Sequence, residues 1–270
     1  MRIILLIIAF LTVSIVEAQN FYEKLKTIPK CEYHLENIQA LTDGQTRYSR
    51  AILSPNAKMI LLIGLDKTQI LDVISRKKII DTEYYFYQQW LSDSLILVRD
   101  RIELKLIQVF PNIMKMTLPI PQLSFENRHI LKATKDNKQW TVANIEGNSN
   151  LYCYSYLFSN DFQKILIYTN GSDYIYYLNG KGLINEIKSM TCCDWSDDDN
   201  NLISFLDLDF GKDYIVESDL YINSVETGDV CKLTETKDIL EIYPSWSHDK
   251  ISYIDDKTGI VYIADLKRNR

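Results

Sequence analysis

The stretch from Tyr243 to Leu266 decides the fold. It reads YPSWSHDK over 243–250, ISYI over 251–254, DDKTG over 255–259 and IVYIADL over 260–266. An apolar strand ends at a Trp-Ser pair, a polar turn follows, and a second short strand leads through an Asp- and Gly-containing turn into a third strand. The stretch therefore predicts two successive hairpins, which together form a three-stranded meander.

Looser copies of this unit precede it along the chain. They align on a Ser that ends an apolar strand, and the steps between successive Ser positions are 38, 67, 37 and 51 residues. A propeller blade takes about 40–50 residues, so three of these steps are single blades, whereas the second is too long for one blade and short for two. The aligned repeat positions are Ser54, Trp90, Ser92, Ser159, Trp195, Ser196, Trp246 and Ser247.

A degenerate copy fills the long step. Residues 131–138 followed by Trp140–Ala143 have the strand–turn–strand pattern, and 25 residues separate Thr134 from the next aligned Ser. Three prolines, at 111, 119 and 121, fall in the same region, where they disfavour a regular sheet interior. We therefore expect six blades, one of them abbreviated, with five as the alternative.

The aligned residues resemble the TolB-type β-propeller repeat. The resemblance is carried by Pro244–Ile251, with its Trp-Ser pair and following Asp and Lys, and by the Tyr-x-x-Asp-Leu strand at 262–266. It extends over about residues 35 to 266. In that family each repeat is one four-stranded blade whose innermost strand ends at the Trp-Ser pair. The resemblance therefore implies an all-β chain that forms a single propeller.

The order of the strands predicts how the ring closes. Residues 35–44 have the pattern of an outer strand entering a turn, while the chain ends after a third strand at Leu266. If the N-terminal strand completes the last blade, no sheet edge is left open at the junction. The two ends of the folded domain should then be neighbours in space.

The N-terminus has the pattern of a secretory signal. A basic start, an apolar run over 3–13 and small residues before Gln19 predict cleavage after residue 18. The alternative is a membrane anchor, but the run is shorter than the roughly 20 apolar residues that a spanning helix needs. We expect a signal peptide at 1–18, a lead-in arm at 19–34 and the propeller at 35–270, in a protein that is secreted or periplasmic without a retained membrane span.

Composition and motifs favour binding over catalysis. The 270 residues carry a net charge of −6 without a basic cluster, which argues against a nucleic-acid partner. The chain has only three histidines and lacks nucleophile-elbow, phosphate-loop and zinc-protease motifs. We expect a non-catalytic scaffold that binds a protein or glycan partner through its loops. The alternative is a stand-alone propeller hydrolase or lyase with acidic residues at the channel mouth.

One observation separates these two functions. An enzyme would show two or three Asp, Glu, His or Arg side chains converging at one mouth of the channel. A binding module would instead show an exposed Tyr or Trp patch on one face, and the chain contains 18 tyrosines.

Three further sets of residues carry expectations. Alternate carboxylates at Asp207, Asp209 and Asp213 are the hard oxygen ligands that Ca²⁺ prefers, although the loop lacks the terminal bidentate Glu; no other cofactor is expected.

The cysteines are odd in number, so at least one thiol is unpaired within the chain, and buried free thiols are the expectation. A single glycosylation sequon occurs at 170–172, with meaning only in a eukaryotic secretory pathway. The five cysteines are Cys31, Cys153, Cys192, Cys193 and Cys231.

Overall fold

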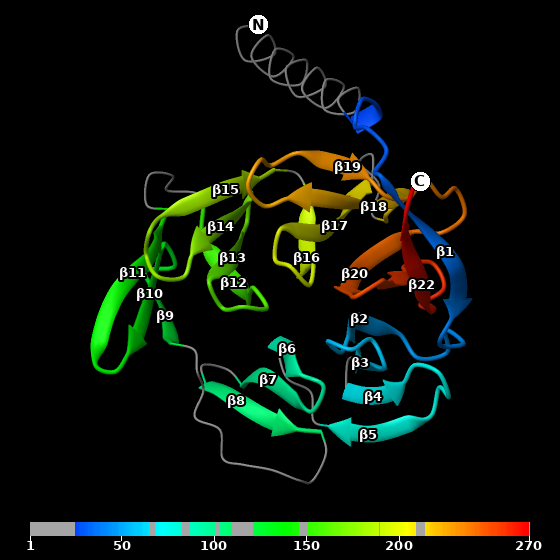
Figure 1. Ribbon diagram of the computed structural model, residues 1–270, viewed down its shortest axis with the longest axis horizontal. Coiled ribbons are helices and arrows are strands. Elements are labelled where there is room, and N and C mark those ends of the chain that lie inside the picture. Colours follow the sequence, from blue (N-terminus) through cyan, green and yellow to red (C-terminus); the bar gives the residue numbers. More distant parts are fainter. Residues whose placement is uncertain are drawn as a thin grey trace, which may run out of the picture.

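The computed structural model describes residues 25–64, 68–82, 87–100, 103–109, 121–145, 151–188, 190–208 and 214–269. In these ranges the chain forms six antiparallel sheets that follow one another around a common centre (Figure 1). The expectation of an all-β, six-bladed propeller is confirmed, and the five-bladed alternative is wrong. The expected signal peptide at 1–18 lies outside the described residues.

Four of the six sheets have four strands. The first blade contains β2 (Tyr48–Leu53), β3 (Met59–Gly64), β4 (Thr68–Asp72) and β5 (Lys78–Thr82). The fourth contains β12 (Cys153–Phe158), β13 (Lys164–Thr169), β14 (Asp173–Tyr177) and β15 (Leu183–Ile187). The fifth contains β16 (Thr191–Trp195), β17 (Asn201–Leu208), β18 (Glu217–Ser224) and β19 (Val230–Lys232). The sixth contains β20 (Glu241–Ser247), β21 (Lys250–Asp255), β22 (Val261–Arg268) and β1 (Tyr33–Ala40).

The second and third blades show three strands each in the described ranges. The second contains β6 (Tyr87–Ser92), β7 (Leu95–Asp100) and β8 (Glu103–Gln108). The third contains β9 (Gln122–Glu126), β10 (Ile130–Lys135) and β11 (Lys138–Asn144). The extra blade expected between Ser92 and Ser159 is therefore present, with three strands in the described residues.

The degenerate copy expected at residues 131–143 is present as a hairpin of the third blade. The copy centred on Thr134 is the hairpin between β10 and β11, and β9 precedes it in the same sheet. Its turn does lie beside the Ser-containing turn of the fourth blade, because Trp140 Nε1 donates to the Leu178 carbonyl at 2.8 Å and Leu178 in turn donates its amide to Gln163. The first strands of the second and fourth blades also meet, since Gln89 Nε2 donates to the Phe158 carbonyl at 2.8 Å.

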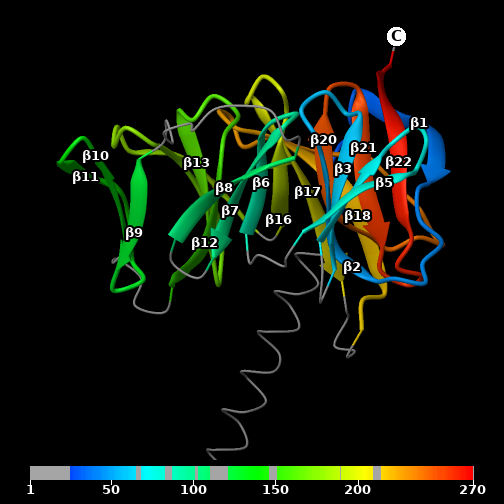
Figure 2. The same cartoon turned by 90° about the horizontal axis from the view of Figure 1, so that it is seen from below.

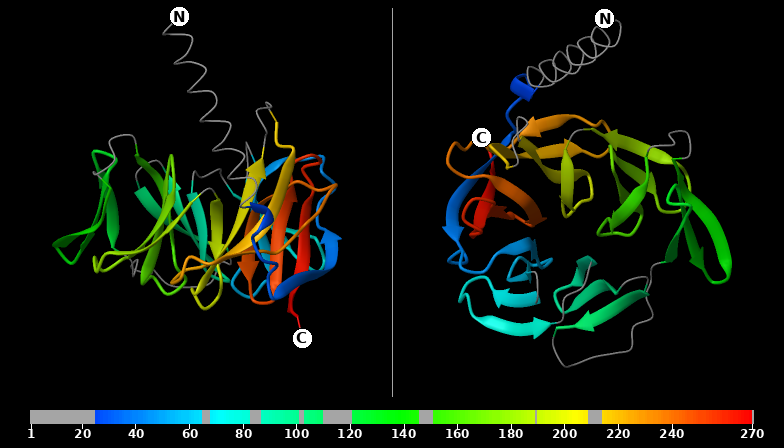
Figure 3. Two further views of the ribbon diagram at one scale, coloured as in Figure 1. Left: turned by 90° about the horizontal axis from the view of Figure 1, so that it is seen from above. Right: turned by 180° about the vertical axis from the view of Figure 1, so that it is seen from behind.

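The N-terminal strand closes the ring as expected. β1 pairs antiparallel with β22, from Tyr33 opposite Arg268 to Ala40 opposite Tyr262. The amide of Asn269 also donates to the Glu32 carbonyl. The blue β1 and the red β22 lie side by side in both views of Figure 3, so the two ends of the folded domain are neighbours.

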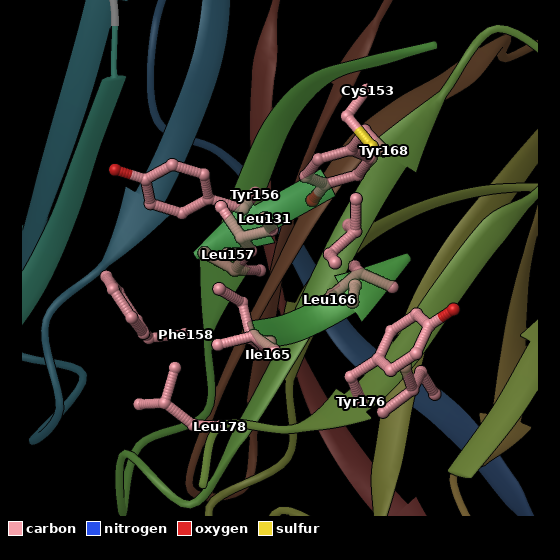
Figure 4. Packing of buried hydrophobic residues seen from close by; sticks show 14 of the residues in the cluster. Leu131, Cys153, Tyr156, Leu157, Phe158, Ile165, Leu166, Tyr168, Tyr176 and Leu178 are labelled. Carbon is pink, nitrogen blue, oxygen red and sulfur yellow. The ribbon is translucent and has the colours of Figure 1, made fainter. Parts of the chain in front are cut away.

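The core lies between the blades because each sheet is covered on both faces. β3 reads MILLIG and every residue in it is buried, which is the pattern of a strand packed on both sides. The largest core cluster joins the third, fourth and fifth blades, and Figure 4 shows Phe158, Ile165 and Leu178 of the fourth blade packed together with Leu131 of the third. The wedge-filling role expected of the Trp before the Ser is confirmed most clearly at Trp195, which is 1% exposed.

The expectation of free thiols is wrong for two cysteines. Cys31 and Cys231 form a disulfide between residues 200 apart in the sequence. The physical reason is that the chain just before β1 runs beside β19: Lys30 and Lys232 form a parallel bridge, and the Cys31 amide donates to the Lys232 carbonyl at 2.9 Å. Cys153 and Cys193 are free, and the side chain of Cys192 is outside the described set.

No helix in the described ranges is both long and apolar enough to cross a bilayer.

Candidate functional site

The aligned Ser residues build the turns at one end of the blades. Ser196 Oγ donates to Asp198 at 2.6 Å and accepts the Asn201 amide at 3.0 Å. Ser54 and Ser159 make the same pair of bonds, to the side chain two residues on and from the amide five residues on. Ser92 does not, because its turn is shorter. The expectation that Ser and the following Asp or Asn fix a tight turn is therefore confirmed in three blades.

These turns form one face of the ring, which we call the turn face: it consists of the turns after β2, β6, β12, β16 and β20. Hydrogen bonds join several of these turns to a neighbouring turn. Asp199 accepts the amides of Asn160 and Asp161 at 2.8 and 2.9 Å, and Asp93 accepts the Asn56 amide at 2.9 Å. Acidic turn residues thus join neighbouring blades, a role that their spacing in the sequence does not reveal. The strands run between this face and the opposite one (Figure 2).

The channel mouth on the turn face contains two carboxylates. A hollow of about 280 Å³ there is lined by residues that include Asp194, Asp197 and His248. Asp194 accepts Ser245 Oγ at 2.5 Å and the Trp246 amide at 3.1 Å. Desolvation in the narrow channel raises the pKa of Asp194 to about 6, against the lowering effect of these hydrogen bonds.

His248 and Asp197 form an exposed pair at this mouth. His248 Nδ1 lies 2.7 Å from Asp197 Oδ2, and the His248 amide donates to the same carboxylate. His248 has φ 53°, which places it at the tip of the two-residue turn between β20 and β21. The expectation that His248 is a surface turn residue is consistent with this position. Both carboxylates at the mouth are therefore engaged in bonds that hold the fifth blade to the sixth.

The opposite face has a different character, and we call it the tyrosine face, after Tyr152, Tyr154 and Tyr214. These side chains are 40%, 53% and 63% exposed. Tyr152 and Tyr154 flank the start of β12, whose other end is at the turn face, and Tyr214 follows the far end of β17. Large, amphipathic aromatic side chains of this kind are enriched where proteins contact partners.

A hollow of about 380 Å³ lies in this face. Its lining includes Tyr154, Asp173, Met190, Leu206 and Asp207, so it combines apolar and acidic groups. Tyr154 is held in place by stacking on Tyr168, with ring centroids 6.2 Å apart.

An arginine extends the patch beside the hollow. Arg128 lies over the Tyr152 ring, 5.9 Å from its centroid. The Tyr152 amide donates to Asn170 Oδ1 at 2.8 Å, which fixes the backbone just before β12. Sequence reasoning missed this arrangement, because Arg128 and Tyr152 are 24 positions apart in the irregular middle third; only the high Tyr count pointed to it.

The proposed calcium ligands are only partly described. Asp207 is exposed near the end of β17 and lines the hollow of the tyrosine face, whereas Asp209 and Asp213 lie outside the described residues. Among the described residues no group of three His, Cys, Asp or Glu is placed to hold a metal ion. The calcium site stays a prediction that depends on the loop beyond Leu208.

Comparisons with known proteins support the fold. No family model matches the sequence, and no curated protein matches it. Among solved structures, the β-propeller domain of Cps50 (Swd1) from Myceliophteria thermophila superposes with a TM-score of 0.51 at 9% identity, over 84% of this chain and 98% of that one. The C-terminal WD40 domain of Sif2 gives a TM-score of 0.37 at 13% identity, over 81% and 69% of the two chains. Hsv2 from Kluyvelomyces marxianus gives 0.38 at 12% identity, over 88% and 86%.

The likeness to the first of these structures establishes the β-propeller fold but no particular class of propeller. Identities this low do not distinguish one class of propeller repeat from another, so the TolB-type resemblance is carried by the repeat residues alone. Function must accordingly be argued from the two faces of the ring.

Proposed function

We propose that this protein is a non-catalytic, extracytoplasmic propeller of the TolB type that binds a protein partner on its tyrosine face. The observation that carries the proposal is the patch of Arg128, Tyr152 and Tyr154 beside a hollow of about 380 Å³. Tyr and Arg are the residue types most enriched at the energetic centres of protein interfaces.

The state of the channel mouth supports binding over catalysis. Acidic and histidine side chains do converge there, as an enzyme would require, but Asp194 and Asp197 accept backbone amides and a hydroxyl from the sixth blade. A general base must be within reach of a substrate proton, and Asp194, the buried carboxylate of this mouth, already holds two blades together, which leaves Asp197 as the accessible carboxylate of the lining.

Two features support a location outside the cytoplasm. The N-terminal pattern is that of a cleaved secretory signal. The disulfide between Cys31 and Cys231 is the kind of bond that persists in an oxidising compartment.

The test is a pull-down with the chain from Gln19 as bait against a cell-envelope extract of its source. Wild type should retain a specific protein, and the double variant Y152A/Y154A should lose it. Y177A is the matched control, since Tyr177 is an exposed tyrosine, 37% exposed, at the turn-face end of β14. Equal retention by the wild type and the double variant would contradict the proposal.

Two further arms of the same experiment separate the alternatives. Protease treatment of the extract should abolish retention, whereas loss after periodate treatment alone would indicate the glycan partner. Addition of EDTA tests the calcium site at Asp207, Asp209 and Asp213: retention that falls with EDTA and returns with Ca²⁺ would support that site.

A further inference from the structure

The hollow on the turn face has a chemistry of its own. Its walls include three aromatic side chains, those of Trp90, Phe162 and Trp246. Trp90 Nε1 donates to the Ile52 carbonyl and Trp246 Nε1 donates to the His248 carbonyl, both at 3.1 Å. Because both indole N–H groups are satisfied, what these side chains can offer to a ligand is ring surface.

The charge of the hollow is negative. Asp194 and Asp197 are the charged side chains of its lining in the described ranges, together with the titratable His248. Asp197 accepts hydrogen bonds from the amide and the ring of His248; the amide does not cancel its charge, and the ring does so only when it is protonated. Asp194 also lines a smaller cavity further down the channel, together with Arg50. Asp197 is therefore the carboxylate that an entering group meets first.

The turns around the hollow add to its negative electrostatic potential. Over the five turns of the turn face, the described sequence has one basic residue, Lys58, against six aspartates, although Lys164 and Lys267 of adjoining strands contact Asp199 and Asp249. Carboxylates gathered around a concave, poorly solvated mouth focus the potential into it and favour an incoming cation. The six residues are Asp93, Asp161, Asp197, Asp198, Asp199 and Asp249.

We propose that the hollow of the turn face binds a basic side chain, arginine or lysine, inserted from a polypeptide, with Asp197 as its counter-charge and Trp90, Trp246 and Phe162 as its aromatic walls. A planar guanidinium or a long alkylammonium satisfies both halves of this lining, since its charge pairs with a carboxylate and its stem and face pack on aromatic rings. A volume of about 280 Å³ admits one such side chain. This site is on the opposite face from the proposed tyrosine patch and does not depend on it.

The probe for the test is a capped Gly-Gly-Arg-Gly-Gly peptide. The comparator replaces arginine by citrulline, which keeps the shape and removes the charge. Binding is followed by the indole N–H signals of the 15N-labelled protein, of which the chain has four. The signals of Trp90 and Trp246 should shift and saturate with the arginine peptide. That of Trp140, which belongs to β11 in the third blade and does not line the hollow, should not move.

Matched variants assign the charge. D197N should weaken binding about fivefold or more, while D249N should change it less than about twofold. Both remove one negative charge from the turn face, but Asp249 does not line the hollow. Unfolding midpoints of both variants confirm that the ring is intact.

Three outcomes would overturn the proposal. They are equal affinity for the arginine and citrulline peptides, equal weakening in the two variants, and no saturating indole shift up to about 10 mM peptide. The peptide comparison uses the wild-type protein alone, so a folding defect in D197N leaves the proposal testable.

Discussion

At the scale of single residues, the aligned Ser positions contribute through hydrogen bonds inside the turn. Ser196 is 4% exposed and its hydroxyl joins Asp198 to the Asn201 amide. Substitution S196A leaves a buried amide without its acceptor, and we expect a loss of about 1–3 kcal/mol in the free energy of unfolding. S92A is the control, because Ser92 is exposed and its Oγ makes only contacts of 3.3–3.4 Å. Urea unfolding of both variants measures the difference; equal losses would show that the turn bonds are not the source of stability.

Glu241 predicts how stability depends on pH. It is 1% exposed at the start of β20, and burial raises its pKa from 4.5 to about 7. The folded protein therefore binds more protons than the unfolded chain between these values, so the stabilisation is complete below pH 4.5 and is lost as pH rises through 7. The loss is on the order of 3 kcal/mol.

The measurement is the unfolding free energy between pH 5 and 8 for wild type, E241Q and the exposed-site control E226Q. E241Q should flatten the decline and E226Q should preserve it. Asp194, whose pKa is also raised, leaves a residual slope of the same sign below about pH 6. A wild-type stability that rises from pH 5 to 8 would contradict this account.

At the scale of elements, acidic residues in the turns hold one blade to the next. Asp199 accepts two amides and a side-chain N–H from the turn after β12. D199A removes the carboxylate that accepts all three bonds, and hydrogen bonds to a charged group contribute about 1.5–3 kcal/mol each. We expect faster hydrogen exchange at Asn160 and Asp161 and a global loss of at least about 2 kcal/mol.

The control for D199A is D229A. Asp229 accepts the Thr227 hydroxyl within one hairpin of the fifth blade and is exposed. It should leave exchange between the blades unchanged. If D199A and D229A gave the same exchange pattern, the acidic turn residues would not act between blades.

The same elements show what a sequence pattern can predict. The Ser-centred hairpins are local, since each is closed by bonds between residues two to five apart, so spacing alone revealed five of them. The hairpin of the third blade at 131–143 was also placed correctly, but the strand before it, β9, was not recognised, because Pro119 and Pro121 argue against a regular strand there. The bonds from Asp199 to Asn160 and from Gln89 to Phe158 join residues 39 and 69 apart, and nothing local encodes them.

At the scale of the whole molecule, ring closure was predictable and the candidate sites were not. Closure follows from counting strands: the last blade has three strands at the end of the chain, and the outer strand at the start of the chain supplies its fourth. The tyrosine face depends on where the irregular middle third places Arg128 beside Tyr152. The two hollows depend on the shapes of gaps between several blades, which no single repeat contains.

The disulfide between Cys31 and Cys231 also depends on this ring closure. β1 belongs to the outer edge of the sixth blade, while the residues just before it run beside β19 of the fifth, so the disulfide fastens one chain segment to two blades. A cross-link between residues 200 apart strongly restricts the unfolded chain. The double variant C31S/C231S should lose about 2–5 kcal/mol of unfolding free energy.

Reductant provides the internal control for this prediction. Dithiothreitol should lower the unfolding midpoint of the wild type toward that of C31S/C231S and leave the double variant unchanged. The exposed ion pair of Lys30 with Glu235 at 3.0 Å is worth less than about 1 kcal/mol, so it cannot replace the disulfide. A wild type whose midpoint is insensitive to reductant, with free thiols detected at both positions, would show that β1 closes the ring by strand pairing alone.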